Sequence, residues 1–194
     1  MQVQVVEKHR EYQGFFRLDR YSLRFERFDG LMTRPVERLI FERGDSAAVL
    51  LYDAQRDIVV LVEQFRFPTY LREAPEGRLM EVVAGTVEDG RTPEQVARSE
   101  LVEEAGFALQ DLEQVAEFYV SPGACTERIH LFIGYVAAQN RVGPGGGVNE
   151  AEDIRVHEVP LDQALTWVRE GRIRDAKTII ALQYLELHKR ARDA

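Results

Sequence analysis

Three glutamates, Glu100, Glu103 and Glu104, are crowded onto five residues of a segment with a helical pattern. Like charges three or four residues apart on a helix repel, at roughly a few tenths of a kcal/mol per pair. A divalent cation removes that repulsion, because Mg²⁺ binds carboxylate oxygens. Glutamate clusters also occur on solvated helix faces, so the spacing alone leaves both explanations open. No other feature of the chain restricts its fold as strongly.

The helix that carries these glutamates has recognisable ends. Thr92 begins the run TPEQ, which offers an N-cap, a proline at the first helical position and the glutamine of a capping box. Gly106 stands where a glycine often follows a helix. The glutamates fall within an arc of about 100° on one side. At about 100° per residue, the opposite, core-facing side is predicted to hold Ala97, Leu101, Val102 and Ala105.

The composition excludes several classes of protein. The chain has 194 residues, which suits one domain with a small extra lobe, and 45% apolar residues, which suffices for a core. A formal charge of −8 argues against a nucleic-acid or anionic-membrane binder. The one cysteine, Cys125, excludes an intrachain disulfide. No run reaches the roughly 20 apolar residues of a membrane helix, so we expect a soluble cytoplasmic protein.

Hydrophobic patterning predicts an α+β fold. Residues 1–45 alternate apolar and polar side chains around a turn at Asp29-Gly30, which predicts an antiparallel β lobe. Short apolar runs predict buried strands, and two amphipathic stretches predict C-terminal helices. We expect strands at 46–53, 57–65, 78–85, 115–121, 128–137 and 153–160, helices at 161–171 and 176–192, and loops at 69–78 and 144–147.

Residues 85–107 also follow the Nudix box, which is Gly, five residues, Glu, seven residues, then Arg-Glu-apolar-x-Glu-Glu-x-Gly-apolar. The spacing matches over all 23 residues, as do the glycines and the three C-terminal glutamates. The chain therefore resembles the Nudix hydrolases. This resemblance implies an α/β/α sandwich (residues 46–194) preceded by the β lobe (residues 1–45).

Further segments resemble the ADP-ribose pyrophosphatase branch of that family. They include VLVEQFR, SPGACTER and EDIRVHEVP, and Pro122 lies sixteen residues after Gly106, where that branch shows a proline. The segments GGGV and IRDAKT are more similar to the GDP-mannose pyrophosphatases. The resemblance implies hydrolysis of the diphosphate of ADP-ribose to AMP and ribose 5-phosphate. GDP-mannose or another nucleotide sugar is the alternative substrate, and a sensor that binds ADP-ribose without hydrolysis is a further alternative.

The resemblance assigns roles to acidic residues of this chain. Glu100 and Glu104 match metal-binding glutamates, together with the backbone carbonyl of Ala84. Glu103 matches the glutamate that binds metal or orients its ligands. In the run NEAEDI, Glu150 would be the general base and Glu152 a further metal ligand, although the same run reads equally well as a polar loop. The implied cation is Mg²⁺, with Mn²⁺ possible.

Other residues are assigned to the substrate by the same resemblance. Arg66 would bind the diphosphate, and its planar fork suits that role; otherwise it is a surface arginine at a strand end. Glu81 would assist the metal or a ribose, or occupy an exposed strand position. Arg38 and Phe15 would contact substrate, Phe15 by stacking on adenine, unless Phe15 belongs to the core. Both lie in the β lobe, which such enzymes exchange between the subunits of a homodimer.

Two positions depart from the box. Arg91 stands where the pattern has Glu, and Ser99 stands where it has Arg. In the family this arginine pairs with carboxylates of the box, and loss of one partner alone would leave an uncompensated charge. Because both positions differ together, we interpret them as a replaced structural pair. Arg98 or Arg91 would then orient the glutamates.

Overall fold

The computed structural model describes residues 1–73, 75–147 and 152–193. These residues divide into two compact units, described separately below. The first consists of residues 1–45 and 119–128, and the second of residues 46–118 and 129–194, as far as they are described. Among the helices of the described residues, none is long and apolar enough to cross a membrane.

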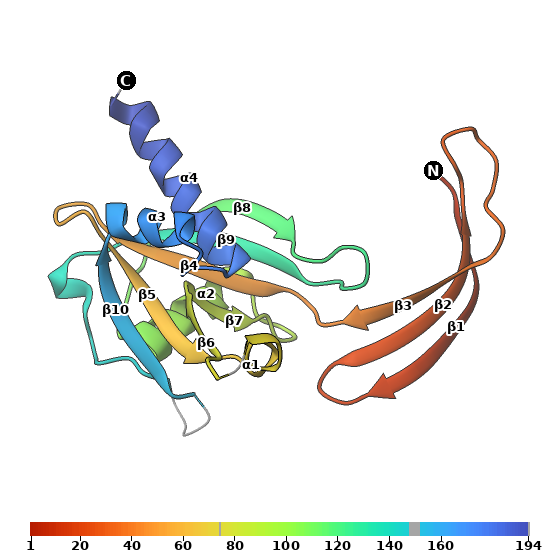
Figure 1. Cartoon of the computed structure of the whole chain (residues 1–194), viewed down its shortest axis with the longest axis horizontal. Coiled ribbons are helices and arrows are strands. Elements are labelled where there is room, and N and C mark those ends of the chain that lie inside the picture. Colours follow the sequence, from red (N-terminus) through yellow and green to blue (C-terminus); the bar gives the residue numbers. More distant parts are fainter. Residues whose placement is uncertain (74, 148–151, 194) are drawn as a thin grey trace. The chain divides into compact units, whose positions relative to one another are not determined.

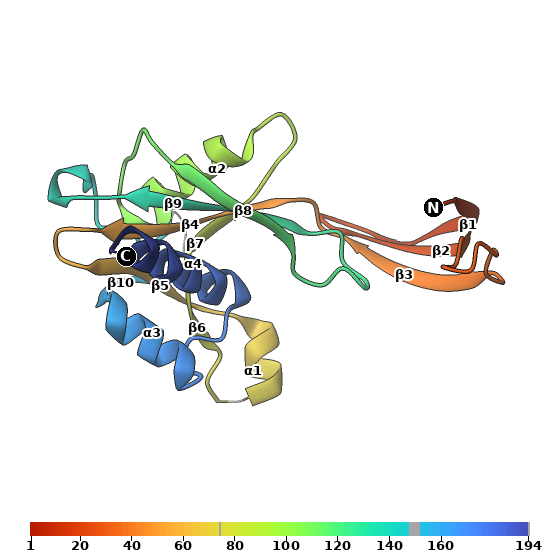
Figure 2. The same ribbon diagram turned by 90° about the horizontal axis from the view of Figure 1, so that it is seen from above.

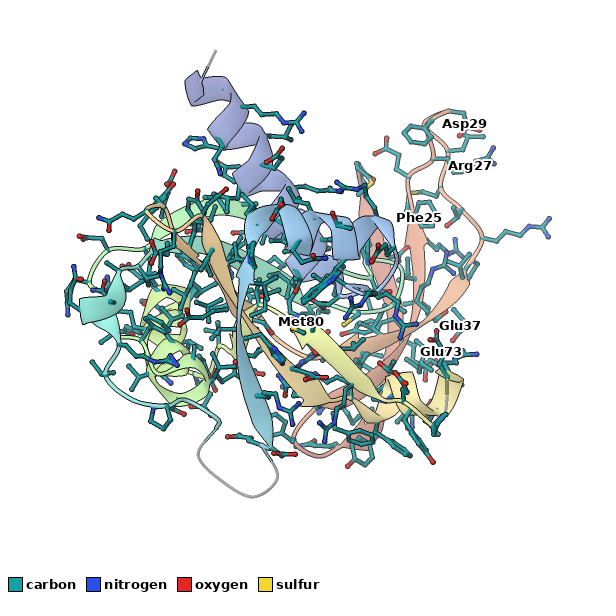
Figure 3. The ribbon with its side chains drawn as sticks, turned by 60° about the vertical axis from the view of Figure 1, so that its left-hand side comes forward. Phe25, Arg27, Asp29, Glu37, Glu73 and Met80 are labelled. Carbon is teal, nitrogen blue, oxygen red and sulfur yellow. The ribbon has the colours of Figure 1, made fainter. Side chains whose placement is uncertain are left out.

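The first unit is built on an antiparallel sheet in the order β1-β2-β3, with β1 at Val3–Gln13, β2 at Arg17–Phe25 and β3 at Val36–Glu42. The predicted antiparallel lobe is therefore confirmed. The turn between β2 and β3 includes Gly30, whose φ of 80° is readily adopted by glycine. Arg27 and Asp29, labelled in Figure 3, form an ion pair at that turn with a distance of 2.7 Å.

This sheet has almost no buried side chain. Within residues 1–45 and 119–128, all of them described, only Asp19 is buried, and its carboxylate is paired with Arg10 and Lys8. Large apolar side chains are exposed on these strands and turns. They include Val3, Val5, Tyr12, Phe15, Phe28, Leu31 and Leu39.

The second unit contains a sheet in the order β10-β5-β4-β9-β8 (Figure 1). The strands are β4 (Ser46–Asp53), β5 (Ile58–Phe65), β8 (Glu113–Tyr119), β9 (Arg128–Tyr135) and β10 (Ile154–Pro160). The β4–β9 pair is parallel, and β4–β5 and β5–β10 are antiparallel. The predicted strands at these places are confirmed within a few residues.

The predicted strand at 78–85 is two strands, β6 (Arg78–Glu81) and β7 (Val83–Thr86). Strands β4 and β5 pair only near their connecting turn, through residues 51–53 and 58–60. Beyond that point β6 pairs with β5, and β7 pairs with β4. The chain thus changes partner at Val82, which belongs to neither strand. We call this change of partner at Val82 the strand fork.

Helices cover both faces of this sheet, as Figure 2 shows. On one face, α3 (Leu161–Arg169) and α4 (Ala176–Asp193) bury an apolar cluster that includes Leu161, Leu182 and Leu185. On the other face, α2 (Pro93–Glu100) and the helical segment η1 (Leu101–Ala105) bury a cluster that includes Val96, Leu101 and Phe107. The α/β/α sandwich is therefore confirmed.

One predicted loop is wrong in part. Residues 67–73 form a short helix, α1 (Phe67–Glu73), in a stretch where residues 69–78 were expected to be a loop. None of its residues is buried, and the apolar side chains at helical spacing, Phe67, Tyr70 and Leu71, are all exposed. Three apolar residues in so short a segment do not distinguish a helix from a loop. Its last residue, Glu73, labelled in Figure 3, forms an ion pair with Arg174. The remaining short element is the 3₁₀ turn η2 (Ala138–Asn140).

Candidate active site

The helix of the box begins as its sequence predicts. The Thr92 side chain accepts a hydrogen bond from the Gln95 amide at 3.2 Å, and the Thr92 amide donates to the Gln95 side chain at 2.9 Å. This reciprocal pair is a capping box. It fixes the start of α2 and thus the direction in which the helix carries its glutamates.

The helix ends in a widened turn. Residues Leu101–Ala105 are π-helical, and the Gly106 amide donates to the carbonyls of both Leu101 and Val102. Gly106 has the predicted left-handed conformation, with φ 74°. The predicted core stripe is wrong at Val102, which is 44% exposed. That prediction assumed an even 100° step per residue, which a π-turn does not keep.

Glu104 is buried rather than solvated, with 8% of its surface exposed. It lies next to the core stripe, where β7 covers it, and its carboxylate accepts a hydrogen bond from the Ala84 amide at 3.2 Å. Burial and the neighbouring charge of Glu100 raise the pKa of Glu104 to about 8. A solvated face is therefore excluded as the explanation for Glu104.

Glu100 approaches the strand that precedes the box. A Cβ atom at Gly85 would overlap the Glu100 carboxylate, so only glycine permits this contact. Burial, together with the charges of Glu103 and Glu152, raises the pKa of Glu100 to about 7. Glu103 is exposed. The three glutamates thus differ in environment: Glu104 is buried, Glu100 is partly buried and Glu103 is exposed.

A glycine-rich loop closes on the end of this helix. The amides of Gly146 and Gly147 donate to the carbonyls of Glu104 and Glu103, at 2.9 and 3.1 Å. These are carbonyls that a helix end leaves without partners. Gly147 in turn packs against Glu152, whose charge acts on Glu100. Glu150, the predicted base, lies outside the described residues.

Arg66 and Glu81 form a bidentate ion pair. Arg66 Nε and Nη2 lie 2.6 and 3.1 Å from the two carboxylate oxygens of Glu81. Glu81 is 2% exposed, so the alternative of an exposed strand position is wrong. Arg66 keeps part of its side chain exposed, and its positive charge acts on Glu104. The pair therefore stands beside the box glutamates.

Arg38 and Phe15 lie in the first unit. Arg38 donates to the Glu37 carbonyl at 2.8 Å and lines a shallow open pocket with Glu11, Leu18 and Arg20. Phe15 is 80% exposed, so the alternative of a core position is wrong. Its ring contacts only the edge of Phe16 among the described aromatic pairs, at 4.7 Å.

The two departures from the box contact each other. Arg91 Nη2 lies 2.5 Å from Ser99 Oγ and 3.0 Å from the Gln95 carbonyl. The interpretation of a replaced pair is thus supported, and the positive charge of Arg91 lowers the pKa of Glu100 against the effects of burial and of Glu103 and Glu152. Arg98 binds Glu94 and the Leu109 carbonyl instead, so its predicted role towards the glutamates is wrong.

The donor set fits a divalent cation. Glu104 is buried and Glu100 is partly buried, and burial and the charges of neighbouring carboxylates raise the pKa values of both. Among residues 1–73, 75–147 and 152–193, no three acidic, histidine or cysteine side chains converge into a ready-made metal cluster. Mg²⁺ in proteins binds carboxylate oxygens and completes its shell with water and substrate phosphates.

Three residues at the start of α4 were not singled out from the sequence. Lys177 Nζ lies 3.2 Å from a carboxylate oxygen of Glu81 and 2.7 Å from one of Asp175. The Thr178 hydroxyl accepts a hydrogen bond from the Val82 amide. The run IRDAKT was noted for its similarity to the GDP-mannose pyrophosphatases, but nothing in its pattern indicates that it reaches Glu81. Only the fold brings them together.

Comparisons with known proteins agree with this geometry. The model of the NUDIX domain matches residues 42–182. ADP-ribose pyrophosphatase of Escherichia coli (strain K12) is 45% identical over 97% of this chain and 90% of its own length. GDP-mannose pyrophosphatase of Cronobacter sakazakii (strain ATCC BAA-894) is 43% identical over 90% of each chain. A crystal structure of an ADP compounds hydrolase has a TM-score of 0.75, at 16% identity, over 99% of this chain and 96% of its own.

Proposed function

The chain belongs to the Nudix family, and on that premise we propose that it hydrolyses ADP-ribose to AMP and ribose 5-phosphate. The observation that carries this proposal is the pair formed by the buried Glu104 and the partly buried Glu100, whose pKa values are raised by burial and by neighbouring carboxylates, with the Arg66 guanidinium acting on Glu104. Carboxylates and a nearby arginine are what a metal-assisted reaction of a diphosphate needs. The similarity to ADP-ribose pyrophosphatases over nearly the whole chain supports the choice of substrate.

Nudix hydrolases use a divalent metal, and we propose that it is Mg²⁺ here, with Mn²⁺ as a substitute. Glu100, Glu104 and Glu152 would hold it, with the carbonyl of Ala84, and Glu103 would orient these ligands. A cation in this place supplies charge neutralisation for the diphosphate and makes a neighbouring water more acidic. Because Glu104 is buried, the effective dielectric constant around it is low, and charge interactions with it are stronger than in water.

The chemical step is a displacement at phosphorus. A water oxygen forms a bond to one phosphorus, the bond from that phosphorus to the bridging oxygen breaks, and the bridging oxygen leaves on the other phosphate. Glu150 accepts the proton of the water in this proposal. Arg66, oriented by Glu81, binds the diphosphate oxygens through the guanidinium N–H groups that Glu81 does not occupy.

We further propose that the protein acts as a homodimer in which residues 1–45 serve the partner's site. A sheet with one buried residue and many exposed apolar side chains has little to hold it on its own, and association would cover those side chains. In that arrangement Phe15 would stack on the adenine and Arg38 would contact the substrate. Sedimentation of the wild-type chain and of a Val3→Glu, Val5→Glu variant tests this: the wild type should be dimeric and the variant should not.

The first test of function is kcat/KM with Mg²⁺ for ADP-ribose and GDP-mannose side by side, with products separated by chromatography. Preference for ADP-ribose with release of AMP is the expected result. Preference for GDP-mannose would favour the second candidate, a nucleotide-sugar pyrophosphatase, which the GDP-mannose pyrophosphatase relatives support.

A sensor that binds ADP-ribose without consuming it is the remaining alternative, motivated by Arg91 and Ser99. Their direct contact favours an intact helix and hence an enzyme. Titration calorimetry with ADP-ribose, first in EDTA and then with Mg²⁺, separates these cases. Continued heat release from turnover after Mg²⁺ is restored identifies the enzyme, whereas simple saturation with intact ligand identifies the sensor.

A further inference from the structure

The strand fork at Val82 is held by a side chain from a distant helix. Val82 lies between β6 and β7, and its amide donates to Thr178 Oγ1 at 2.8 Å rather than to a neighbouring strand. Thr178 is fully buried. A buried amide without a partner costs roughly 1–3 kcal/mol, so Thr178 makes it possible for the chain to change strand partner at this residue.

Thr178 is itself fixed by the residue that precedes α4. Its hydroxyl donates to Asp175 Oδ2 at 2.7 Å, and its amide donates to the same oxygen at 2.9 Å. Asp175 thus acts as an N-cap for the first turn of α4. The other oxygen of Asp175 lies 2.7 Å from Lys177 Nζ. The first turn of α4 therefore places the Thr178 hydroxyl at the strand fork and the Lys177 ammonium group next to it.

Lys177 continues this contact to Glu81, the last residue of β6. The ammonium lies 3.2 Å from Glu81 Oε2, and the same carboxylate holds Arg66 through both oxygens. Burial lowers the pKa of Lys177, but Asp175 and Glu81 outweigh burial and the pKa is raised, so the side chain stays charged. Four side chains, Arg66, Glu81, Lys177 and Asp175, therefore alternate in charge from α4 to the site.

This alternation balances two positive against two negative charges in a buried place. Removal of Lys177 would leave Glu81 and Asp175 with Arg66 alone, next to the negative charges of Glu100 and Glu104. The Arg66 guanidinium would then pair with these carboxylates and would be less available to bind a ligand. Loss of the Thr178 hydroxyl would free the fork and with it the adjacent Glu81, whose carboxylate sets the angle of the guanidinium.

We propose that Thr178 and Lys177 are positioning residues for Arg66, because they anchor the strand fork and Glu81 and thereby present the guanidinium to the diphosphate. Neither residue touches the reacting atoms. The proposal rests on one part of the proposed function, namely that Arg66 binds the diphosphate. The ligand group concerned is a diphosphate, whether free or within a nucleotide.

The test compares Thr178→Val with Thr178→Ser. Valine keeps the shape and removes the hydroxyl, whereas serine keeps the hydroxyl. For ADP-ribose we expect Thr178→Val to raise KM about 10-fold with kcat within about 2-fold, because an interaction made equally in the ground and transition states is lost. Thr178→Ser should restore KM. Inorganic pyrophosphate, measured by calorimetry, should lose affinity by a similar factor.

Thr166→Val serves as the matched control. Thr166 on α3 donates its hydroxyl to the Asp162 carbonyl at 2.9 Å and contacts neither the fork nor Glu81. The same chemical change there should leave KM unchanged. If Thr178→Val folds poorly, Lys177→Met and Lys177→Arg form a second pair, with KM raised in the first and recovered in the second. A lower Tm with unchanged KM and pyrophosphate affinity in both pairs would overturn the inference.

A double-variant cycle separates this inference from the proposed function. In an Arg66→Met background, Thr178→Val should have no further effect on KM, because the residue that it positions is gone. A full additional effect would show that Thr178 acts by another route and would overturn the inference. If Arg66→Met alone leaves KM and pyrophosphate affinity unchanged, the assignment of Arg66 in the proposed function fails instead.

Discussion

Two neighbouring regions of the second unit bury carboxylates in opposite ways. At the strand fork, Glu81 is enclosed by Arg66 and Lys177, so its charge is met by the protein itself. At the end of the box helix, Glu104 has one backbone amide and Glu100 as a like-charged neighbour. Buried charges are normally paired. The contrast therefore distinguishes a carboxylate whose charge is balanced by the protein from carboxylates that, in the proposed function, bind a cation.

The largest effect is expected from Glu104→Gln. The amide keeps the shape and cannot replace the charge, so turnover of ADP-ribose with Mg²⁺ should fall by at least about 10³-fold, since several kcal/mol of charge stabilisation are lost. In EDTA the same variant should be more stable than the wild type at pH 8, because a buried charge has been removed. Steady-state kinetics and urea unfolding check the two halves. Near-normal turnover would contradict the metal assignment.

Glu81→Gln should lower the free energy of unfolding, whereas Glu104→Gln should raise it. Removal of one partner from a buried charge cluster typically costs about 3 kcal/mol, because Lys177 is left with Asp175 alone. Urea unfolding in EDTA at pH 8 should therefore show a loss for Glu81→Gln beside a gain for Glu104→Gln. Equal losses of unfolding free energy in the two variants would show that the two regions do not differ in how they accommodate a buried carboxylate.

The pH dependence of stability gives the next largest effect. The pKa values of Glu100 and Glu104 are raised to about 7 and about 8 in the folded protein, against about 4.3 for an unfolded chain. Between these values the folded state binds more protons, so the free energy of unfolding falls as pH rises. From pH 5 to pH 9 in EDTA we expect a loss of at least about 2 kcal/mol.

Two comparisons control for other titrating groups in that experiment. The Glu104→Gln variant should lose much of this slope, and saturating Mg²⁺ should flatten it because the cation stabilises the ionised, folded form. A wild-type stability that is level or rises between pH 5 and pH 9 in EDTA would show that these carboxylates are compensated after all.

The smallest effect concerns the contact between Arg91 and Ser99. Arg91→Met should raise the Mg²⁺ concentration for half-maximal activity by about 10-fold, a typical effect for residues that support metal ligands, because Arg91 favours the ionised form of Glu100. The double variant Arg91→Glu, Ser99→Arg exchanges this contact for the pair of the family pattern and should recover wild-type activation. Failure to recover would mean that the contact is not a substitute for that pair.

The sequence predicts the parts of this molecule that depend on local pattern. The capping box at Thr92, the left-handed glycine at 106 and the buried strands all follow from short-range signals. The strand fork does not, because no turn signal interrupts residues 78–84 and only the neighbouring strands decide where pairing changes. Helix α1 is not predicted for another reason, since its seven residues bury no side chain and are too few to establish a periodicity.

The candidate site is divided in the same way. The positions of Glu100 and Glu104 follow from the box, but the burial of Glu104 depends on β7 lying over it, which no spacing reveals. One partner of Glu81, Lys177, lies 96 positions away in the chain, and the other, Arg66, lies 15 positions away. The roles assigned to all the site residues, Glu150, Arg38 and Phe15 included, and the exchange of the lobe stay predictions.

The π-turn at Leu101–Ala105 has a consequence for how this site tolerates change. The turn holds one residue more than an α-helical turn would, and that surplus sets the rotation of Glu104 relative to Glu100. A substitution within the segment alters one side chain, whereas deletion of a single residue would convert the wide turn into an ordinary α-helical turn and change the rotation of the glutamates relative to each other. The geometry of this helix end thus depends more on the number of residues in the segment than on which side chains they carry.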